Sequence, residues 1–226
     1  KSRLDRKLWT QQKEGNKVQL IDVDDERAEA EFVVQRASQD MGHLRDHVVL
    51  YRTNAQSRVL EEACLRAGIP YKVIGGVKFY ARKEIKDMVA YLRLIHNVRD
   101  DASLVRIINT PTRKVGEKTL ETLQRLARQH GISLFQVMAD DRIIETELSA
   151  EKVNRLKAFV RLIQGLEEFC REFPVSTLIR EVLHRTQYDQ MLKEEREIGE
   201  TRLDNIQELV TVARKYDALE LPVGLA

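Results

Sequence analysis

Residues 49–74, VLYRTNAQSRVLEEACLRAGIPYKVI, alternate between two kinds of local pattern. The β-branched and aromatic residues of His47–Tyr51 (HVVLY) and of Tyr71–Ile74 (YKVI) are typical of strands. Between them, Gln56–Ala67 has the apolar spacing of a helix, and Gly68 is a residue type that commonly ends one. A strand, a helix and a second strand in this order predict a βαβ unit with parallel strands.

The same alternation extends toward the N-terminus. Val18–Val23 (VQLIDV) predicts a further buried strand, and Glu26–Ser38 predicts a helix that Asp24 or Asp25 caps. Three strands are few for a freestanding parallel sheet, which indicates that partner strands are missing from this chain. The first part of the chain is therefore expected to be α/β.

From Glu84 onward the patterns are helical, and the expected fold class is α/β followed by mostly α. The composition shifts near Asp140–Glu147, which predicts a domain boundary there. The predicted helices in this part are Glu84–Asn97, Ala102–Ile108, Glu117–Gln129, Ser133–Met138, Ala150–Glu172, Val175–Arg185 and Ile198–Ala218.

The composition favours a soluble globular protein of the reducing cytoplasm. Of the 226 residues, 42% are hydrophobic and 33% are charged, and no apolar run approaches the ~18 residues that a membrane span needs. The start, KSRLDRKLWT, lacks the apolar stretch of a signal peptide. Cys64 and Cys170 make neither a disulfide framework nor a Cys/His metal pattern, so no metal site is expected.

Positive charge is concentrated in the middle of the chain. Residues 1–77 hold 13 basic and 12 acidic side chains, a net charge of +1, whereas residues 78–130 hold 12 and 6, a net charge of +6. Residues 131–226 hold 13 basic and 18 acidic side chains, a net charge of −5. This asymmetry suggests a polyanion contact in the middle segment, and a solvated surface is the alternative.

Tyr51 and Arg52 stand at the C-terminal end of a predicted strand, where ligands of open α/β sheets bind. A tyrosine ring offers a stacking face, and a guanidinium offers a forked set of donors that matches phosphate. The pair therefore predicts a nucleotide contact, and the alternative is a surface arginine beside a half-buried tyrosine.

Two later stretches predict DNA contacts. In GGVKFYARKEIKDMVAYL, residues 75–92, basic residues are interleaved with aromatic ones, a pattern that suits single-stranded DNA; the candidates are Lys78, Arg82 and Lys86. A charge network that fixes the local backbone is the alternative for Arg82, Glu84, Lys86 and Asp87. In NTPTRKVGEKTL, residues 109–120, a turn opens a helix, and exposed N–H groups at a helix start bind phosphate. The candidates there are Arg113, Lys114, Gly116 and Lys118.

The segment LYRTNAQSRVLEEACLRAGIPYKVIGG resembles motif IV of the UvrD/Rep/PcrA helicases, and residues 75–92 resemble motif IVa. TRLDNIQELVT, residues 201–211, is similar to a helix of the family's mobile 2B subdomain. The resemblance implies that Tyr51 stacks on adenine and that Arg52 is a catalytic residue that reaches the terminal phosphate.

The resemblance also implies an ATP-dependent DNA helicase that works with Mg²⁺, moves 3′ to 5′ on single-stranded and duplex DNA and acts in DNA repair. Residues 1–146 would be part of a RecA-like 2A subdomain, and residues 147–226 the first part of the helical 2B subdomain. The family's phosphate loop and its Mg²⁺-binding carboxylates are absent from the sequence. The chain alone is therefore expected to be inactive and to need the 1A and 1B subdomains and the rest of 2A and 2B.

Two other functions remain open on the sequence. A non-catalytic DNA-binding module would use the helix–hairpin–helix-like element near Arg113–Lys118. A helical protein-interaction module would use the acidic region after Gly131.

Overall fold

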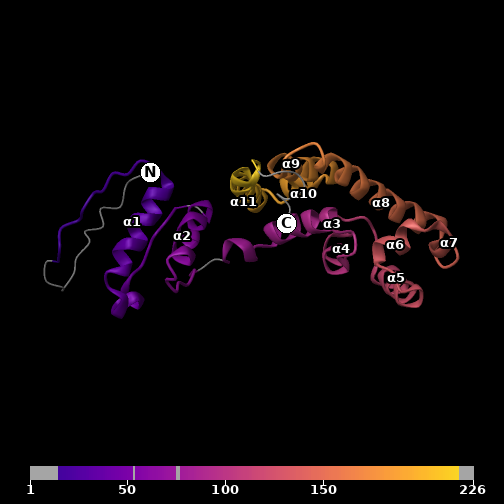
Figure 1. The fold of residues 1–226 in the computed structure, drawn as a ribbon, viewed down its shortest axis with the longest axis horizontal. Helices are drawn as coiled ribbons and strands as arrows, with labels where there is room; N and C mark the ends of the chain where they lie inside the picture. The colour runs from indigo at the N-terminus through magenta and orange to yellow at the C-terminus, as the bar shows by residue number, and fades with distance from the viewer. Residues whose placement is uncertain (1–14, 53, 75–76, 219–226) are drawn as a thin grey trace, which may run out of the picture.

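A computed structural model describes residues 15–52, 54–74 and 77–218, and all regular secondary structure in these ranges is helical (Figure 1). The 3₁₀ segments are η1 (Met41–Asp46), η2 (Phe79–Ala81) and η3 (Arg214–Tyr216). The α-helices are α1 (Glu26–Ser38), α2 (Asn54–Arg66), α3 (Lys83–His96), α4 (Asp101–Ile107), α5 (Glu117–His130), α6 (Leu134–Ala139), α7 (Asp141–Ile144), α8 (Ala150–Cys170), α9 (Val175–Thr186), α10 (Tyr188–Glu194) and α11 (Glu197–Ala213).

The predicted RecA-like parallel sheet is wrong. Within the described ranges, residues 18–23, 47–51 and 71–74 form no strand. Side chains expected to be buried are open to solvent: Val18 is 99% exposed, Leu20 98% and Leu50 90%. The local pattern of these segments favours an extended backbone, but a strand exists only where a neighbour supplies the ladder hydrogen bonds. No described segment pairs with them in that way.

Helices α1 and α2 pack together as a small unit at one end of the molecule (Figure 1). Its core contains Ala30 and Val34 from α1, Val59 and Ala63 from α2, and Ile69 from the segment that follows. Because this apolar contact is small, the position of the pair depends strongly on polar contacts with the rest of the chain.

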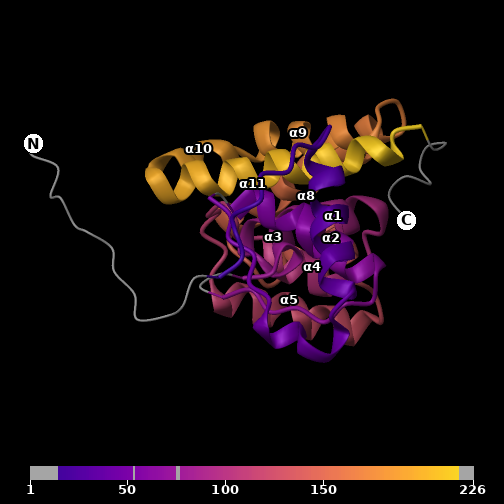
Figure 2. The same ribbon diagram turned by 90° about the vertical axis from the view of Figure 1, so that its left-hand side faces the viewer.

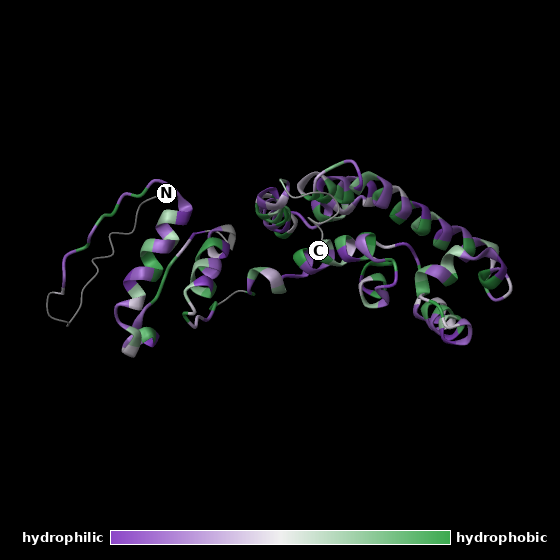
Figure 3. Cartoon of the chain, in the orientation of Figure 1, coloured by the Kyte–Doolittle hydropathy of each residue, from purple (hydrophilic) through white to green (hydrophobic). Residues whose placement is uncertain are grey.

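The remaining helices share one large core that runs from Phe79 to Ala213. Helices α8 to α11 lie as one layer over α3 to α6, as both views show (Figures 1 and 2). Apolar residues recur on one face of each long helix, so that hydrophobic and hydrophilic stripes alternate along the ribbon (Figure 3). On α8 the buried face consists of Val153, Leu156, Phe159, Val160, Ile163, Leu166 and Cys170.

Gly199 is a position where α10 and α11 approach each other closely. A Cβ added at this position would overlap the backbone carbonyl group of Leu192, which cannot move without shifting α10. We expect Gly199→Ala to lower the free energy of unfolding by about 1–3 kcal/mol, measured by urea denaturation. The control is Gly165→Ala in α8, where the added methyl meets only the end of a long side chain, Nη1 of Arg185, 3.2 Å away. The control should be neutral or stabilising, and an equal loss in both variants would contradict the prediction.

Candidate functional site

Tyr51 and Arg52 lie immediately before α2, and both are exposed. The Arg52 backbone N–H donates to Oε1 of Gln56, one turn into α2, at 3.0 Å. Within the described residues, the Arg52 guanidinium has no hydrogen-bond or ion-pair partner, so it is available to a ligand. The Tyr51 ring, 36% exposed, offers a face beside it.

Lys78 and Lys86 line a shallow groove of about 350 Å³ beside α2, together with Tyr71 and Tyr80. The Lys78 Nζ lies 4.6 Å from the centroid of the Tyr71 ring, a cation–π contact. Both lysines are exposed, and Tyr80 is half exposed. The groove therefore brings two exposed lysines next to two aromatic rings, and its lining also includes the Glu61 and Glu62 carboxylates.

The two phenol groups of this groove stay protonated at neutral pH. Burial and a 3.0 Å hydrogen bond to the Glu61 carboxylate raise the pKa of Tyr71 to about 12. Burial likewise raises the pKa of Tyr80. Neither ring adds negative charge to the groove, whose charged lining consists of Arg58, Lys78 and Lys86 with Glu61 and Glu62.

Arg82 is buried and contacts three separate parts of the chain. Its Nη1 donates to Oδ1 of Asn205 at 2.6 Å, its Nη2 donates to the Ser57 hydroxyl at 2.9 Å, and its Nε donates to the Val77 carbonyl at 3.2 Å. Only 8% of the residue is exposed. The structure thus places Arg82 inside a polar network, as the alternative interpretation of this stretch described.

Arg113 closes the turn between α4 and α5. Its Nη1 donates to the carbonyl oxygens of Ile107, Ile108 and Pro111 at 3.0, 3.2 and 3.1 Å, and its Nη2 donates to the Tyr91 hydroxyl at 2.9 Å. Its guanidinium also lies 5.1 Å from the centroid of the Phe159 ring. These contacts fix the shape of the loop that presents the next residues.

Lys114, Gly116 and Lys118 form the exposed part of this turn. Lys114 has a φ of 57°, and Gly116 is the N-cap of α5 without a side-chain cap. Within the described residues, the N–H groups of Glu117 and Lys118 have no acceptor. Free N–H groups at a helix start, flanked by two lysines, make a suitable phosphate site.

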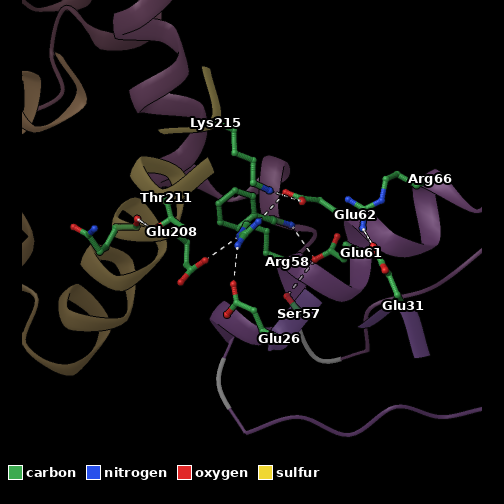
Figure 4. Close-up of polar contacts among 12 residues, drawn as sticks. Glu26, Glu31, Ser57, Arg58, Glu61, Glu62, Arg66, Glu208, Thr211 and Lys215 are labelled. Carbon is green, nitrogen blue, oxygen red and sulfur yellow. Dashed lines mark hydrogen bonds and ion pairs between the residues drawn. The ribbon is translucent and has the colours of Figure 1, made fainter. Parts of the chain in front are cut away.

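A buried polar contact between α2 and α11 is the feature that the sequence did not reveal. The Arg58 Nε donates to Oε2 of Glu208 at 2.9 Å, and its Nη1 donates to Oε1 of Glu62 at 2.9 Å (Figure 4). The Arg58 side chain is only 3% exposed. Burial by itself would lower the pKa of Arg58, but the hydrogen bonds with Glu208 and Glu62 outweigh it and raise that pKa.

Asn205, one turn before Glu208 on α11, completes this contact. It accepts from Arg82, and its Nδ2 donates to Oε1 of Glu84 at 2.7 Å. We call the set Ser57, Arg58, Glu62, Arg82, Glu84, Asn205 and Glu208 the α2–α11 seam. Every buried side-chain nitrogen or oxygen among the described residues has a partner, so the seam is fully satisfied.

One sequence signal could have revealed the seam. Asn205 and Glu208 lie three residues apart on a helix with an apolar face, so they share a side of α11 close to the core. By spacing alone they belong to an amphipathic core helix, and Arg58 reads as a residue near a helix start. Their partners lie more than a hundred residues earlier, and no local pattern identifies them.

The described residues contain neither a membrane-spanning helix nor a cluster of metal ligands. Every helix in the described part of the chain is too short or too polar to cross a lipid bilayer. The described residues also contain no group of three or more His, Cys, Asp or Glu side chains arranged to hold a metal ion. Residues 15–52, 54–74 and 77–218 therefore supply no evident Mg²⁺ site.

Comparison with known proteins identifies the family. Residues 1–224 match the UvrD-like helicase C-terminal domain. The chain is 41% identical over 221 residues to the ATP-dependent DNA helicase PcrA of Bacillus subtilis, covering 96% of the chain and 30% of that protein. It is 40% identical over 221 residues to DNA helicase II of Escherichia coli, covering 95% of the chain and 30% of that protein. The chain thus spans under a third of the length of these relatives, and it belongs to the UvrD-like helicase family.

Proposed function

We propose that this chain is part of an ATP-dependent DNA helicase in which Arg52 contacts the terminal phosphate of ATP. The main support is the Arg52 guanidinium, which is exposed and without a partner among the described residues, while its backbone is tied to α2 through Gln56. The similarity to ATP-dependent DNA helicases supports the same assignment.

Tyr51 and Arg52 have the chemistry to contact the base and the terminal phosphate of a nucleotide, respectively. The Tyr51 ring would stack on the adenine, and Arg52 would stabilise the negative charge that develops on the phosphoryl group. ATP supplies the phosphoryl-transfer chemistry that drives movement. The described residues offer no carboxylate cluster for Mg²⁺, so the Mg²⁺ ligands and the phosphate loop would come from other parts of a longer protein.

DNA would contact two basic regions. Lys78 and Lys86, beside the Tyr80 ring, suit single-stranded DNA, because lysines attract the phosphates and the ring can stack on a base. Lys114, Gly116 and Lys118 suit the backbone of a duplex. Arg82 and Arg113 would act on the DNA site by fixing the backbone that presents these residues, since their guanidinium groups already have protein partners.

We further infer that residues 1–146 and 147–226 belong to the 2A and 2B subdomains, respectively. The division falls between α7 and α8, although Ile144 and Leu148 share a core with Val153 across it. In the longer protein we propose 3′ to 5′ movement along DNA, a role in DNA repair and a cytoplasmic location.

ATP hydrolysis tests this assignment. A longer protein that carries this chain together with the 1A and 1B subdomains should hydrolyse ATP, and single-stranded DNA should stimulate it. The 226-residue chain alone should show no turnover, because it lacks a phosphate loop. A coupled-enzyme assay of ADP release, with and without a single-stranded DNA oligonucleotide, measures the turnover of both proteins. Measurable DNA-stimulated turnover by the chain alone would contradict the assignment of the nucleotide site.

A non-catalytic DNA-binding module is the second candidate, because Lys114 and Lys118 make no described ion pair and flank free N–H groups. Under either candidate, Lys114→Ala and Lys118→Ala should each weaken duplex binding. Each should also reduce the slope of log affinity against log salt concentration by about one, because one phosphate contact is lost. Fluorescence anisotropy of a labelled duplex at several salt concentrations measures this slope.

The matched control is Lys193→Ala on α10, an exposed lysine that pairs with Asp189 at 3.1 Å. It removes the same charge at a distance from the turn, so the slope should stay unchanged. An equal loss of affinity in all three variants would point to net charge alone rather than to a site at the turn.

A further inference from the structure

Helix α11 belongs to the large helical body but also contacts α2. It packs against α3, α9 and α10 through Ile206, Leu209 and Val210 on its buried face. Its polar residues Asn205 and Glu208 lie beside this apolar face, where Asn205 bonds to Arg82 and to Glu84 of α3 and Glu208 bonds to Arg58 of α2. The position of α2 relative to the body therefore depends on the side chains of α11.

Helix α2 in turn carries the residue that the proposed function places at the phosphate. Arg52 lies six residues before Arg58, and its backbone N–H is bonded to the Gln56 side chain on the first turn of α2. Apart from the seam and the small α1–α2 core, α2 is tied to the body through Glu61, which accepts from the Phe79 N–H at 3.3 Å. A shift of α2 would consequently move the Arg52 backbone.

The seam has the properties of a discrete contact rather than a sliding one. The Arg58 guanidinium is almost fully buried between Glu208 and Glu62, with Glu26 3.8 Å away. If α11 moved by a small distance, Arg58 would lose its 2.9 Å bond to Glu208 before water could take its place, which is unfavourable. Helix α2 must therefore follow α11 or break the pair completely.

We propose that Glu208 and Asn205 are positioning residues that set the placement of Arg52 through Arg58, Arg82 and α2. This inference rests on the proposed function, because it assigns a role in ATP hydrolysis to residues that touch neither nucleotide nor DNA. The seam thereby makes hydrolysis depend on the position of the helical body. The seam would thus do more than stabilise the fold, because it would determine where one side chain, that of Arg52, lies.

The first test uses Glu208→Gln in a longer protein that carries this chain. The substitution keeps the size of the side chain and removes its charge. We expect kcat for DNA-stimulated ATP hydrolysis to fall about tenfold while KM for ATP changes less than about twofold, since orientation rather than binding is lost. The matched control is Asp204→Asn on the exposed side of α11, which removes the same charge and should leave both constants unchanged.

The second test asks whether Glu208 acts through Arg52. In a protein that already carries Arg52→Ala, adding Glu208→Gln should not lower kcat further, because the side chain to be positioned is gone. Independent, multiplicative losses would overturn the inference, as would a kcat for Glu208→Gln equal to that of the control. If Glu208→Gln melts at a markedly lower temperature, Glu208→Asp, which keeps the charge and shortens the reach, replaces it in both assays with the same expectations.

Failure of the inference is distinguishable from failure of the proposed function. If the unaltered longer protein shows no DNA-stimulated hydrolysis, the proposed function falls, and the inference falls with it. If that protein is active and Glu208→Gln behaves as Asp204→Asn does, only the inference falls.

Discussion

Replacing Arg52 with alanine in a longer protein that carries this chain should lower kcat for DNA-stimulated ATP hydrolysis by about a thousandfold. An arginine that meets the transferring phosphoryl group stabilises charge that develops mainly in the transition state, so nucleotide affinity should change much less. Steady-state kinetics give kcat, and the fluorescence of a labelled, non-hydrolysable nucleotide gives the affinity.

Arg45→Ala is the control for this substitution. Arg45 is also an exposed arginine in the first part of the chain, within η1, and it makes no described ion pair. Its loss should leave hydrolysis unchanged. Equal losses of kcat and of nucleotide affinity in Arg52→Ala would show that Arg52 binds the ground state and would contradict a transition-state role.

Replacing Arg58 with methionine should lower the free energy of unfolding by about 3–5 kcal/mol. Methionine keeps much of the volume but removes the cation that both the Glu208 and the Glu62 carboxylates contact. The Arg58 side chain is almost fully buried, so water cannot fully take the place of the guanidinium beside the two carboxylates. Chemical denaturation of the 226-residue chain, followed by circular dichroism, measures the effect.

Arg66→Met provides a comparison on the same helix. Arg66 is 46% exposed, and its contact with Glu31 is a long one of 3.7 Å (Figure 4). An exposed pair of this kind contributes under about 1 kcal/mol. If Arg58→Met destabilised the chain no more than Arg66→Met does, the seam would not hold α2 in place.

Local sequence signals predicted the helices well. Helix α1 occupies residues 26–38 as predicted, and the Asp25 carboxylate caps it by accepting from the N–H groups of Arg27 and Ala28 at 2.9 and 2.7 Å. Gly68, predicted to end α2, has a φ of 66°, a conformation that glycine adopts without strain. Caps and apolar spacing are properties of neighbouring residues, and the sequence displays them directly.

The predicted strands were wrong because strand formation is not a local property. HVVLY and VQLIDV contain suitable residues, yet each requires hydrogen bonds from a segment that their own sequence does not specify. Helix α10 was missed for a different reason. It starts at Tyr188 directly after Gln187, a non-glycine residue with a φ of 59°, so no glycine or proline marked the break from α9.

The candidate site was predictable in part. The sequence placed Tyr51 and Arg52 at the C-terminal end of a strand, which is wrong, but it predicted the helix that follows them, and the structure leaves both residues exposed. Their roles with a nucleotide stay a prediction, as do the DNA contacts. Arg82 is buried against Asn205, which lies 123 residues later, and no local sequence pattern identifies a partner so far along the chain.

The α2–α11 seam also bears on the order of folding. Its bonds join residues 150 and 123 positions apart, whereas the α1–α2, α3–α4 and α8–α9 contacts join neighbouring helices. Bringing distant segments together costs loop-closure entropy before any contact compensates for it, so local helical pairs assemble sooner. Arg58 thus has only Glu62 and Glu26 as acidic neighbours until α11 arrives, and the end of the chain that bears Arg52 acquires its final orientation late.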